Sequence, residues 1–278
     1  MPSVSTSPHP GAVPSARRVA LLAHGAGSTP DFLHRALGAP LARLGYQVVS
    51  WRWPAGPFAG GAVEAELAAL AERTRPALVG GVRAERHAAA SWAARTGWAG
   101  TLLLVMPAWT GAPDAVAAQS AVAADEIERR GLDATLARIR TSAHPWVAAE
   151  LDRAWPAHGA ERLVAALRYA AEQPAPAADD LRRIRAAAAV VALNGDPLHP
   201  TAVARQWAGL VPRASLGVAT LPGPGVDGGR PEPDLGAAAL AALRRLGGAP
   251  DVSGSLRSPA RAPADRGRDG IHLRARHP

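Results

Sequence analysis

The sequence contains no cysteine and no lysine. Without cysteine the chain can form neither a disulfide framework nor a cysteine-ligated metal site, which is compatible with a reducing compartment. All 31 basic residues are therefore arginine, and the formal net charge is +8. The arginines are spread along the chain among acidic residues, and the excess of alanine, glycine and proline around them is typical of a coding bias. Because binding to nucleic acid needs clustered basic charge, we do not expect nucleic acid as the main partner.

Long apolar runs are also missing. No stretch approaches the roughly 18 consecutive apolar residues that a membrane-spanning helix needs, and the first residues lack the apolar segment of a signal peptide. We therefore expect a cytoplasmic protein that does not contact a membrane. The sequence does not decide its oligomeric state.

Both ends of the chain are poor in residues that could be buried. Residues 1–16 are rich in serine and proline, and residues 248–278 are rich in arginine and proline. Such segments cannot bury enough apolar surface to offset the entropy of ordering, so we expect both to be disordered. One domain over residues 17–247 remains.

Within this domain, short apolar runs alternate with helical segments. Unbroken apolar runs are typical of strands that are buried on both faces of a parallel sheet. Alternation with helices indicates right-handed crossover connections. We predict an α/β fold with a mainly parallel sheet of about six strands and helices on both faces. The predicted strands are 19–23, 47–53, 77–79, 101–105, 186–193 and 215–221.

The stretch 113–185 interrupts this rhythm, because its apolar residues follow helical spacing without a convincing strand. About four short helices fit it. We expect a helical insertion that covers the carboxyl edge of the sheet, where parallel sheets bind ligands.

One glycine-containing stretch has the pattern of a strand that feeds a helix through a tight turn. Residues 77–79 predict the strand, Gly80 and Gly81 the turn, and the alanine-rich residues up to Arg95 the helix. This is the pattern of a nucleophile elbow, Gly-x-Ser-x-Gly. The five positions 81–85 read Gly-Val-Arg-Ala-Glu in this chain.

Together with the loop His24-Gly25-Ala26-Gly27 after the first strand and Asp196 just before a proline, this pattern resembles the α/β-hydrolase superfamily. The likeness covers residues 19–246 and is to a compact bacterial branch with a His-Gly-Ala-Gly loop. The resemblance implies a serine esterase or thioesterase lineage. It also implies an oxyanion-type loop at residues 24–27, completed by Ala84, and a catalytic acid at Asp196. Asp196 can equally be a turn or helix-cap residue.

Two of the three catalytic positions carry unsuitable side chains. Arg83 stands at the nucleophile position, and arginine is protonated at neutral pH and cannot attack a carbonyl. Val226 stands where relatives have the histidine. Glu85 replaces the second glycine of the elbow. We expect a degenerate triad in which Arg83 pairs directly with Asp196 and Val226 fills the space of the imidazole.

No other set of residues predicts a working triad. Asp196 and His199 could ligate a metal, but no third ligand is in view, so we expect neither a metal nor a cofactor. The other nucleophiles and bases that we considered are Ser28, Ser91, Thr110, Ser142, His24, His87, His144 and His158.

Trp109, Thr110 and His199 each lie in a loop that follows a predicted strand, and we expect them to border a pocket. Trp146 and Trp155 from the helical insertion could add apolar walls, or could pack the insertion onto the sheet. The ligand expected there is a small apolar molecule or an ester.

Three functions remain open at this point. The first is a protein of the hydrolase lineage that has lost serine chemistry and binds a small molecule or a partner. The second is an active carboxyl-ester or thioester hydrolase with an unrecognised nucleophile. The third is an arginine-rich interaction protein that uses its tail.

Overall fold

The protein is described by a computed structural model that covers residues 18–51, 61–82, 85–223 and 230–247. The two terminal segments that were expected to be disordered, 1–16 and 248–278, lie outside these residues, as do Arg83, Ala84 and Val226.

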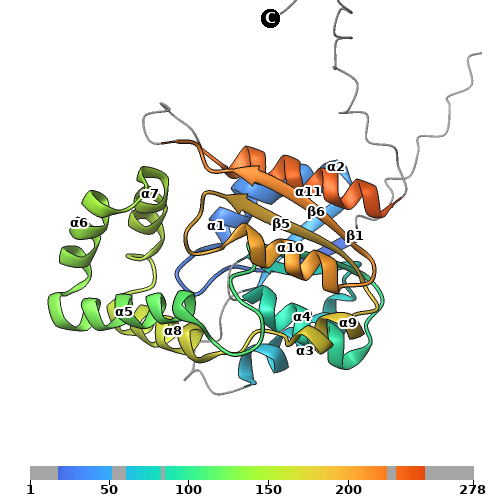
Figure 1. The fold of residues 1–278 in the computed structure, drawn as a ribbon, viewed down its shortest axis with the longest axis horizontal. Coiled ribbons are helices and arrows are strands. Elements are labelled where there is room, and N and C mark those ends of the chain that lie inside the picture. Colours follow the sequence, from blue (N-terminus) through green and yellow to red (C-terminus); the bar gives the residue numbers. More distant parts are fainter. Residues whose placement is uncertain (1–17, 52–60, 83–84, 224–229, 248–278) are drawn as a thin grey trace, which may run out of the picture.

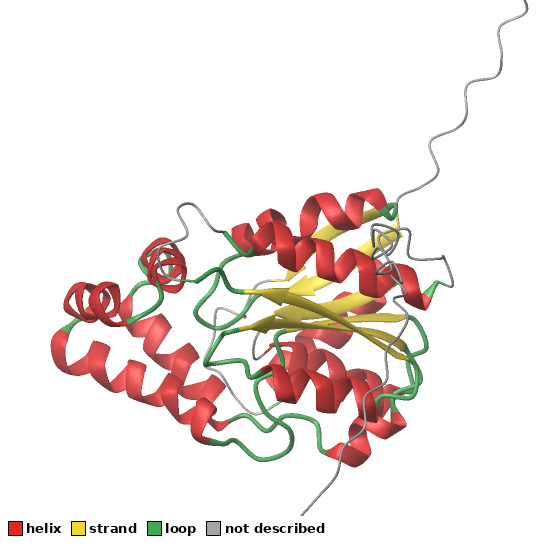
Figure 2. Ribbon diagram, turned by 45° about the horizontal axis from the view of Figure 1, so that its top comes forward, coloured by secondary structure: helices red, strands yellow, loops and turns green. Residues whose placement is uncertain are grey.

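Six parallel strands form a single sheet in the order β2-β1-β3-β4-β5-β6 (Figures 1 and 2). Residues of opposite parity pack on opposite faces: Leu21 contributes to the core on one side, and Leu22 to the core on the other. Both faces are buried, which is why the strand sequences are unbroken apolar runs. The predicted fold class is confirmed. The strands are β1 (Arg18–Ala23), β2 (Tyr46–Trp51), β3 (Leu78–Val82), β4 (Thr101–Val105), β5 (Ala187–Asn194) and β6 (Ala214–Thr220).

Helices cover both faces of the sheet (Figure 2). One face is covered by α1 (Pro30–Leu33), η1 (His34–Gly38), α2 (Ala39–Arg43) and α11 (Glu232–Leu246). The other is covered by α3 (Ala62–Thr74), α4 (Glu85–Thr96), α9 (Ala178–Arg183) and α10 (Thr201–Leu210). Helices α1, η1 and α2 follow one another without a break and form one helical stretch, whose middle part, η1, is a π-helix.

The prediction that the chain turns at Gly80 and Gly81 is wrong. Both glycines belong to β3, which pairs with β4 through residue 82. A Cβ on Gly80 would lie 2.1 Å from the carbonyl oxygen of Leu103 on β4. Glycine is therefore required here because the two strands approach each other closely, and not because the chain reverses.

Between β4 and β5 the chain forms a helical cover that lies to one side of the sheet, at the left of Figure 1. It consists of α5 (Ala115–Arg130), α6 (Leu132–Ser142), α7 (Pro145–Ala154) and α8 (Ala160–Glu172). Asp114 caps α5 by accepting a hydrogen bond from the backbone N–H of Val116 at 2.8 Å. A small core of its own, with Ile127 and Leu163, holds α5 against α8. Helix α9, also expected within the insertion, instead packs beside α4 and α10, and its Leu181 belongs to the core on that face of the sheet.

Throughout the described parts of the chain, every helix is too short or too polar to cross a membrane.

Candidate functional site

A cavity of about 310 Å³ lies between the helical cover and the loops that follow β1, β4 and β5. This is the carboxyl edge of the sheet, where open α/β sheets bind ligands. From the sheet side it is lined by Ala26, Gly27, Ala108, Trp109, Leu198 and His199. From the cover it is lined mainly by apolar residues of α5 to α8 and by Trp155, with the polar groups of Gln119, Ser120, Arg138 and Ser142.

The loop His24–Ser28 forms one wall of this cavity and is fixed from two sides. Within the loop, the N–H of Ser28 donates to the carbonyl of Gly25 at 2.8 Å. From the cover, His158 Nε2 donates to the carbonyl of Ser28 at 2.8 Å. A Cβ on Gly27 would lie only 2.8 Å from Trp155 Nε1. The glycine thus lets the indole of Trp155 pack directly against the loop.

Burial lowers the pKa of His158, although its hydrogen bond to the Ser28 carbonyl opposes this effect. The imidazole is therefore neutral at pH 7 and needs a proton on Nε2 to make that bond.

The loop after β5 carries a buried carboxylate and imidazole in direct contact. His199 Nδ1 lies 2.7 Å from Asp196 Oδ2, and both residues are 7% exposed. A carboxylate only accepts, so Nδ1 carries the proton and Nε2 is the basic nitrogen of the ring. Asp196 Oδ1 also accepts from the N–H of Leu198 at 2.9 Å. The carboxylate therefore shapes the turn, and it also orients a histidine that lines the cavity. A role of Asp196 as catalytic acid stays a prediction.

Solved structures of several hydrolases have the same fold as this chain. A carboxylesterase of the thaumarchaeon Nitrososphaera gargenis matches with a TM-score of 0.62 and 13% identity, over 75% of this chain and 83% of that one. The enol-lactonase of Burkholderia xenovorans LB400 matches with a TM-score of 0.57 and 16% identity, over 74% and 83%. An acetylester hydrolase of Corynebacterium glutamicum gives 0.59 and 12%, over 83% of both chains. This chain has the α/β-hydrolase fold. No known family profile matches the sequence, and no curated protein matches it.

In the α/β-hydrolase fold the nucleophile lies on a sharp turn between a strand and a helix, and the sequence pattern predicts that turn after β3. The residues that the sequence predicted for the nucleophile and histidine positions, Arg83 and Val226, lie outside the described residues, as does Ala84. Glu85 begins α4. The proposed pairing of Arg83 with Asp196 accordingly stays a prediction.

Of the three predicted pocket residues, Trp109 and His199 line the cavity, and Thr110 is absent from its described lining. The hydroxyl of Thr110 donates to Gln206 Oε1 at 2.9 Å and accepts from Trp207 Nε1 at 2.9 Å. It therefore joins the loop after β4 to α10. Both hydrogen bonds depend on residues nearly one hundred positions away, so the local sequence gave no signal of them.

The two tryptophans of the cover have different surroundings. Trp155 lines the cavity. Trp146 packs against Phe32, with ring centroids 6.3 Å apart, and its indole N–H donates to Glu232 at 3.1 Å. Trp155 therefore forms part of the pocket wall, whereas Trp146 packs the cover against the rest of the domain.

The hydroxyls of two further candidate nucleophiles, Ser142 and Ser28, make no hydrogen bond to a histidine in the described structure. Ser142 Oγ donates to the carbonyl of Arg138, and Ser28 Oγ is buried without a hydrogen-bond partner in the described structure. Ser50 Oγ does lie 3.0 Å from His34 Nε2, a pair that sequence analysis missed. Both of these residues, on β2 and η1, are absent from the described cavity lining. Within the described ranges there is also no group of three side chains that could hold a metal ion.

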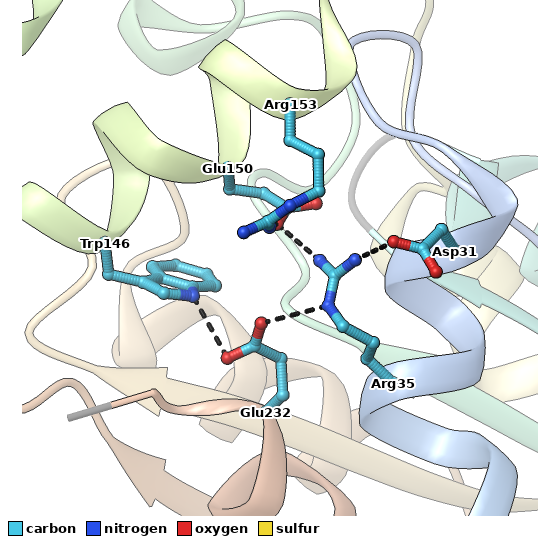
Figure 3. Close-up of polar contacts among 6 residues, drawn as sticks. All are labelled: Asp31, Arg35, Trp146, Glu150, Arg153 and Glu232. Atoms are coloured by element: carbon cyan, nitrogen blue, oxygen red, sulfur yellow. Dashed lines mark hydrogen bonds and ion pairs between the residues drawn. The ribbon is translucent and has the colours of Figure 1, made fainter. Parts of the chain in front are cut away.

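A buried ionic cluster fixes the cover relative to the sheet (Figure 3). Arg35 on η1 pairs with Glu150 on α7 at 2.5 Å, with Glu232 at the start of α11 at 3.4 Å, and with Asp31. Glu150 is 1% exposed and also pairs with Arg153 at 2.6 Å. The cluster connects three elements that are far apart in the sequence, and thereby positions the cavity wall formed by α7.

Proposed function

We propose that this α/β-hydrolase-fold protein binds a small apolar ligand of the ester or acyl class in the cavity beneath the helical cover, and that it has lost serine hydrolysis. The observation that carries the proposal is the cavity itself. It joins the loop His24–Ser28 to Trp109, Trp155 and the side chains of α5 to α8. Concave, mainly apolar sites with a few polar groups are typical of small-molecule binding.

The loss of serine chemistry rests on the sequence, since Arg83 and Val226 cannot act as nucleophile and base. The neighbouring hydrolases support the lineage and the class of ligand, but their activities belong to those proteins. The cytoplasmic location expected from the sequence stays a prediction.

The test combines binding with turnover. Phenyl acetate is titrated against the protein while tryptophan fluorescence is recorded, because Trp109 and Trp155 line the cavity. We expect saturable quenching, no turnover of p-nitrophenyl acetate and no labelling by a fluorophosphonate probe. Ala123→Trp, which fills the cavity from α5, should abolish the quenching. Labelling of a single serine would contradict the loss of serine chemistry, and quenching that survives in Ala123→Trp would contradict the site.

The replacement of the catalytic nucleophile and histidine can be tested separately with the triple variant Arg83→Ser, Glu85→Gly, Val226→His. If the lost residues are the only obstacle, this variant should gain esterase activity and react with the fluorophosphonate probe. A folded but inactive triple variant would show that the change extends beyond these positions.

A second candidate function, ester hydrolysis without a serine, is favoured by the Asp196–His199 contact. An imidazole whose Nδ1 proton is held by a carboxylate can take a proton from water at Nε2. The resulting hydroxide oxygen would bond to the ester carbonyl carbon, and the same proton would pass to the departing alkoxide as the C–O bond breaks. If p-nitrophenyl acetate is turned over without probe labelling, His199→Gln should abolish that turnover, whereas His34→Gln should leave it unchanged.

A further inference from the structure

A second cavity, of about 630 Å³, lies on the other side of the loop that follows β4. Its walls come from α3 and α4, from the segment 173–177 and from the start of α9. Small apolar side chains, among them Ala88, Ala112, Ala170 and Ala175, share the lining with the polar groups of His87 and Ser91 and with the charged groups of Glu64, Arg95 and Asp180. None of the functions considered above uses this space.

A thin partition separates the two cavities. Ala170 on α8 lines both of them. The loop after β4 passes between them, with Ala108 and Trp109 facing the first cavity, and Gly111 and Ala112 facing the second.

The bulk of the partition is a pair of rings. Trp109 lines the first cavity and His87 lines the second, and the two rings meet edge to face with centroids 4.6 Å apart. Removing the indole of Trp109 would therefore open the first cavity towards the second.

The partition is held more firmly on one side than on the other. Trp207 packs against His87 with centroids 5.5 Å apart, and its own indole N–H is bound to Thr110. The indole N–H of Trp109 is buried and lacks a hydrogen-bond acceptor within the described structure. Trp109 is thus retained by packing alone.

We propose that Trp109 sets the maximum length of the ligand's chain, and that the ligand class is an unbranched acyl or alkyl chain with an oxygen-bearing head group. The head group occupies the first cavity, and the chain ends where it meets the Trp109 ring. A shortened side chain at this position lets the chain continue past Ala170 into the second cavity. This inference rests on the proposed function, because it concerns the same ligand site.

The test is a chain-length series. Unbranched fatty acids from butanoate to tetradecanoate are titrated into the full-length protein by calorimetry. Each buried methylene strengthens binding roughly fourfold. For the native protein we expect affinity to rise with length and then stop rising once the first cavity is filled. For Trp109→Ala we expect the rise to continue over several further methylenes.

Two controls make the result specific. We call the chain length at which affinity stops rising the break point of the series. Trp98→Ala removes an indole that lines neither cavity, and it should leave this break point unchanged. Adding Ser91→Trp to Trp109→Ala fills the second cavity, and it should restore the native break point. Trp109→Leu, a milder change that keeps an apolar contact, should move the break point in the same direction as Trp109→Ala.

The outcomes separate the two proposals. If fatty acids bind but the break point is the same in the native protein, Trp109→Ala and Trp109→Leu, the inference about Trp109 is wrong and the ligand site stands. If no fatty acid of any length binds to a folded native protein or to a folded variant, the inference and its acyl ligand are both overturned. The phenyl acetate titration then decides whether the ligand site itself remains.

Discussion

Asp196 and His199 form a buried carboxylate–imidazole pair, 2.7 Å apart, within one turn of chain at the carboxyl edge of the sheet. The carboxylate also accepts the N–H of Leu198. It thus stabilises the loop after β5 and orients the imidazole at the cavity wall. The acid position implied by the family resemblance therefore has a histidine partner three residues away, and this is a histidine that the sequence predicted to border the pocket.

The first prediction concerns this pair. Asp196→Ala leaves the N–H of Leu198 and the Nδ1–H of His199 without this acceptor, and should lower the free energy of unfolding by about 1–3 kcal/mol. Asp196→Asn keeps one carbonyl oxygen and should cost less than Asp196→Ala. Urea unfolding followed by fluorescence measures both variants. Equal stability of the alanine variant and the native protein would mean that the pair does not hold the loop.

The second prediction concerns the ionic cluster of Figure 3. Arg35→Met leaves Glu150 and Glu232 buried without this partner, and removal of one member of a buried ion pair costs about 3–5 kcal/mol. We expect about 3 kcal/mol, because Glu150 keeps its pairing with Arg153.

The matched control for Arg35→Met is Arg140→Met. The pair of Arg140 with Asp152, at 2.7 Å, lies at the surface, with side-chain exposures of 53% and 30%. Loss of such a pair should cost about 1 kcal/mol or less. Similar losses in both variants, from urea unfolding, would show that the buried cluster does not fix the cover.

The third prediction follows from the lowered pKa of His158. In the unfolded chain its imidazole takes up a proton near pH 6.5, and in the folded protein it does so only at lower pH. Between these values the unfolded state binds more protons, so stability rises with pH and is lost as pH falls through this window. His158→Gln removes this component, and its stability should fall less than that of the native protein between pH 7 and pH 5. His34→Gln, at an exposed site, should follow the native profile. An unchanged slope in His158→Gln would contradict the burial effect.

The fourth prediction uses two glycines with different surroundings. At Gly27 a methyl group would meet Trp155 Nε1 at 2.8 Å, whereas at Gly209 on α10 nothing lies within 4 Å. Gly27→Ala must displace the indole, and should destabilise the protein by about 1–3 kcal/mol and weaken phenyl acetate quenching. Gly209→Ala should instead stabilise it by about 0.5–1 kcal/mol, because glycine is unfavourable in a helix. If thermal melting gave Gly27→Ala the same gain as Gly209→Ala, the close contact with Trp155 would be refuted.

The sequence by itself determined the fold class and the positions of the strands along the chain. Apolar runs such as 101–105 are unbroken because both faces of a parallel sheet are buried, and that pattern is local and readable. The predicted bounds of β4, 101–105, agree with the observed ones, and helices α5 to α8 lie within the stretch 113–185 that was predicted to be helical. Turns were harder to predict, since Gly80 and Gly81 are compatible with a reversal or with close strand packing, and only the position of β4 distinguishes the two.

What only the tertiary structure decided is which side chains meet. Trp155 against Gly27, His158 on the carbonyl of Ser28 and the His87–Trp109 contact each join residues that are far apart along the chain. Such contacts depend on where helices of the cover settle on the sheet, and no periodicity in the sequence encodes that placement. The two cavities and their partition exist for the same reason: they are spaces left between elements, and they appear only once those elements are packed.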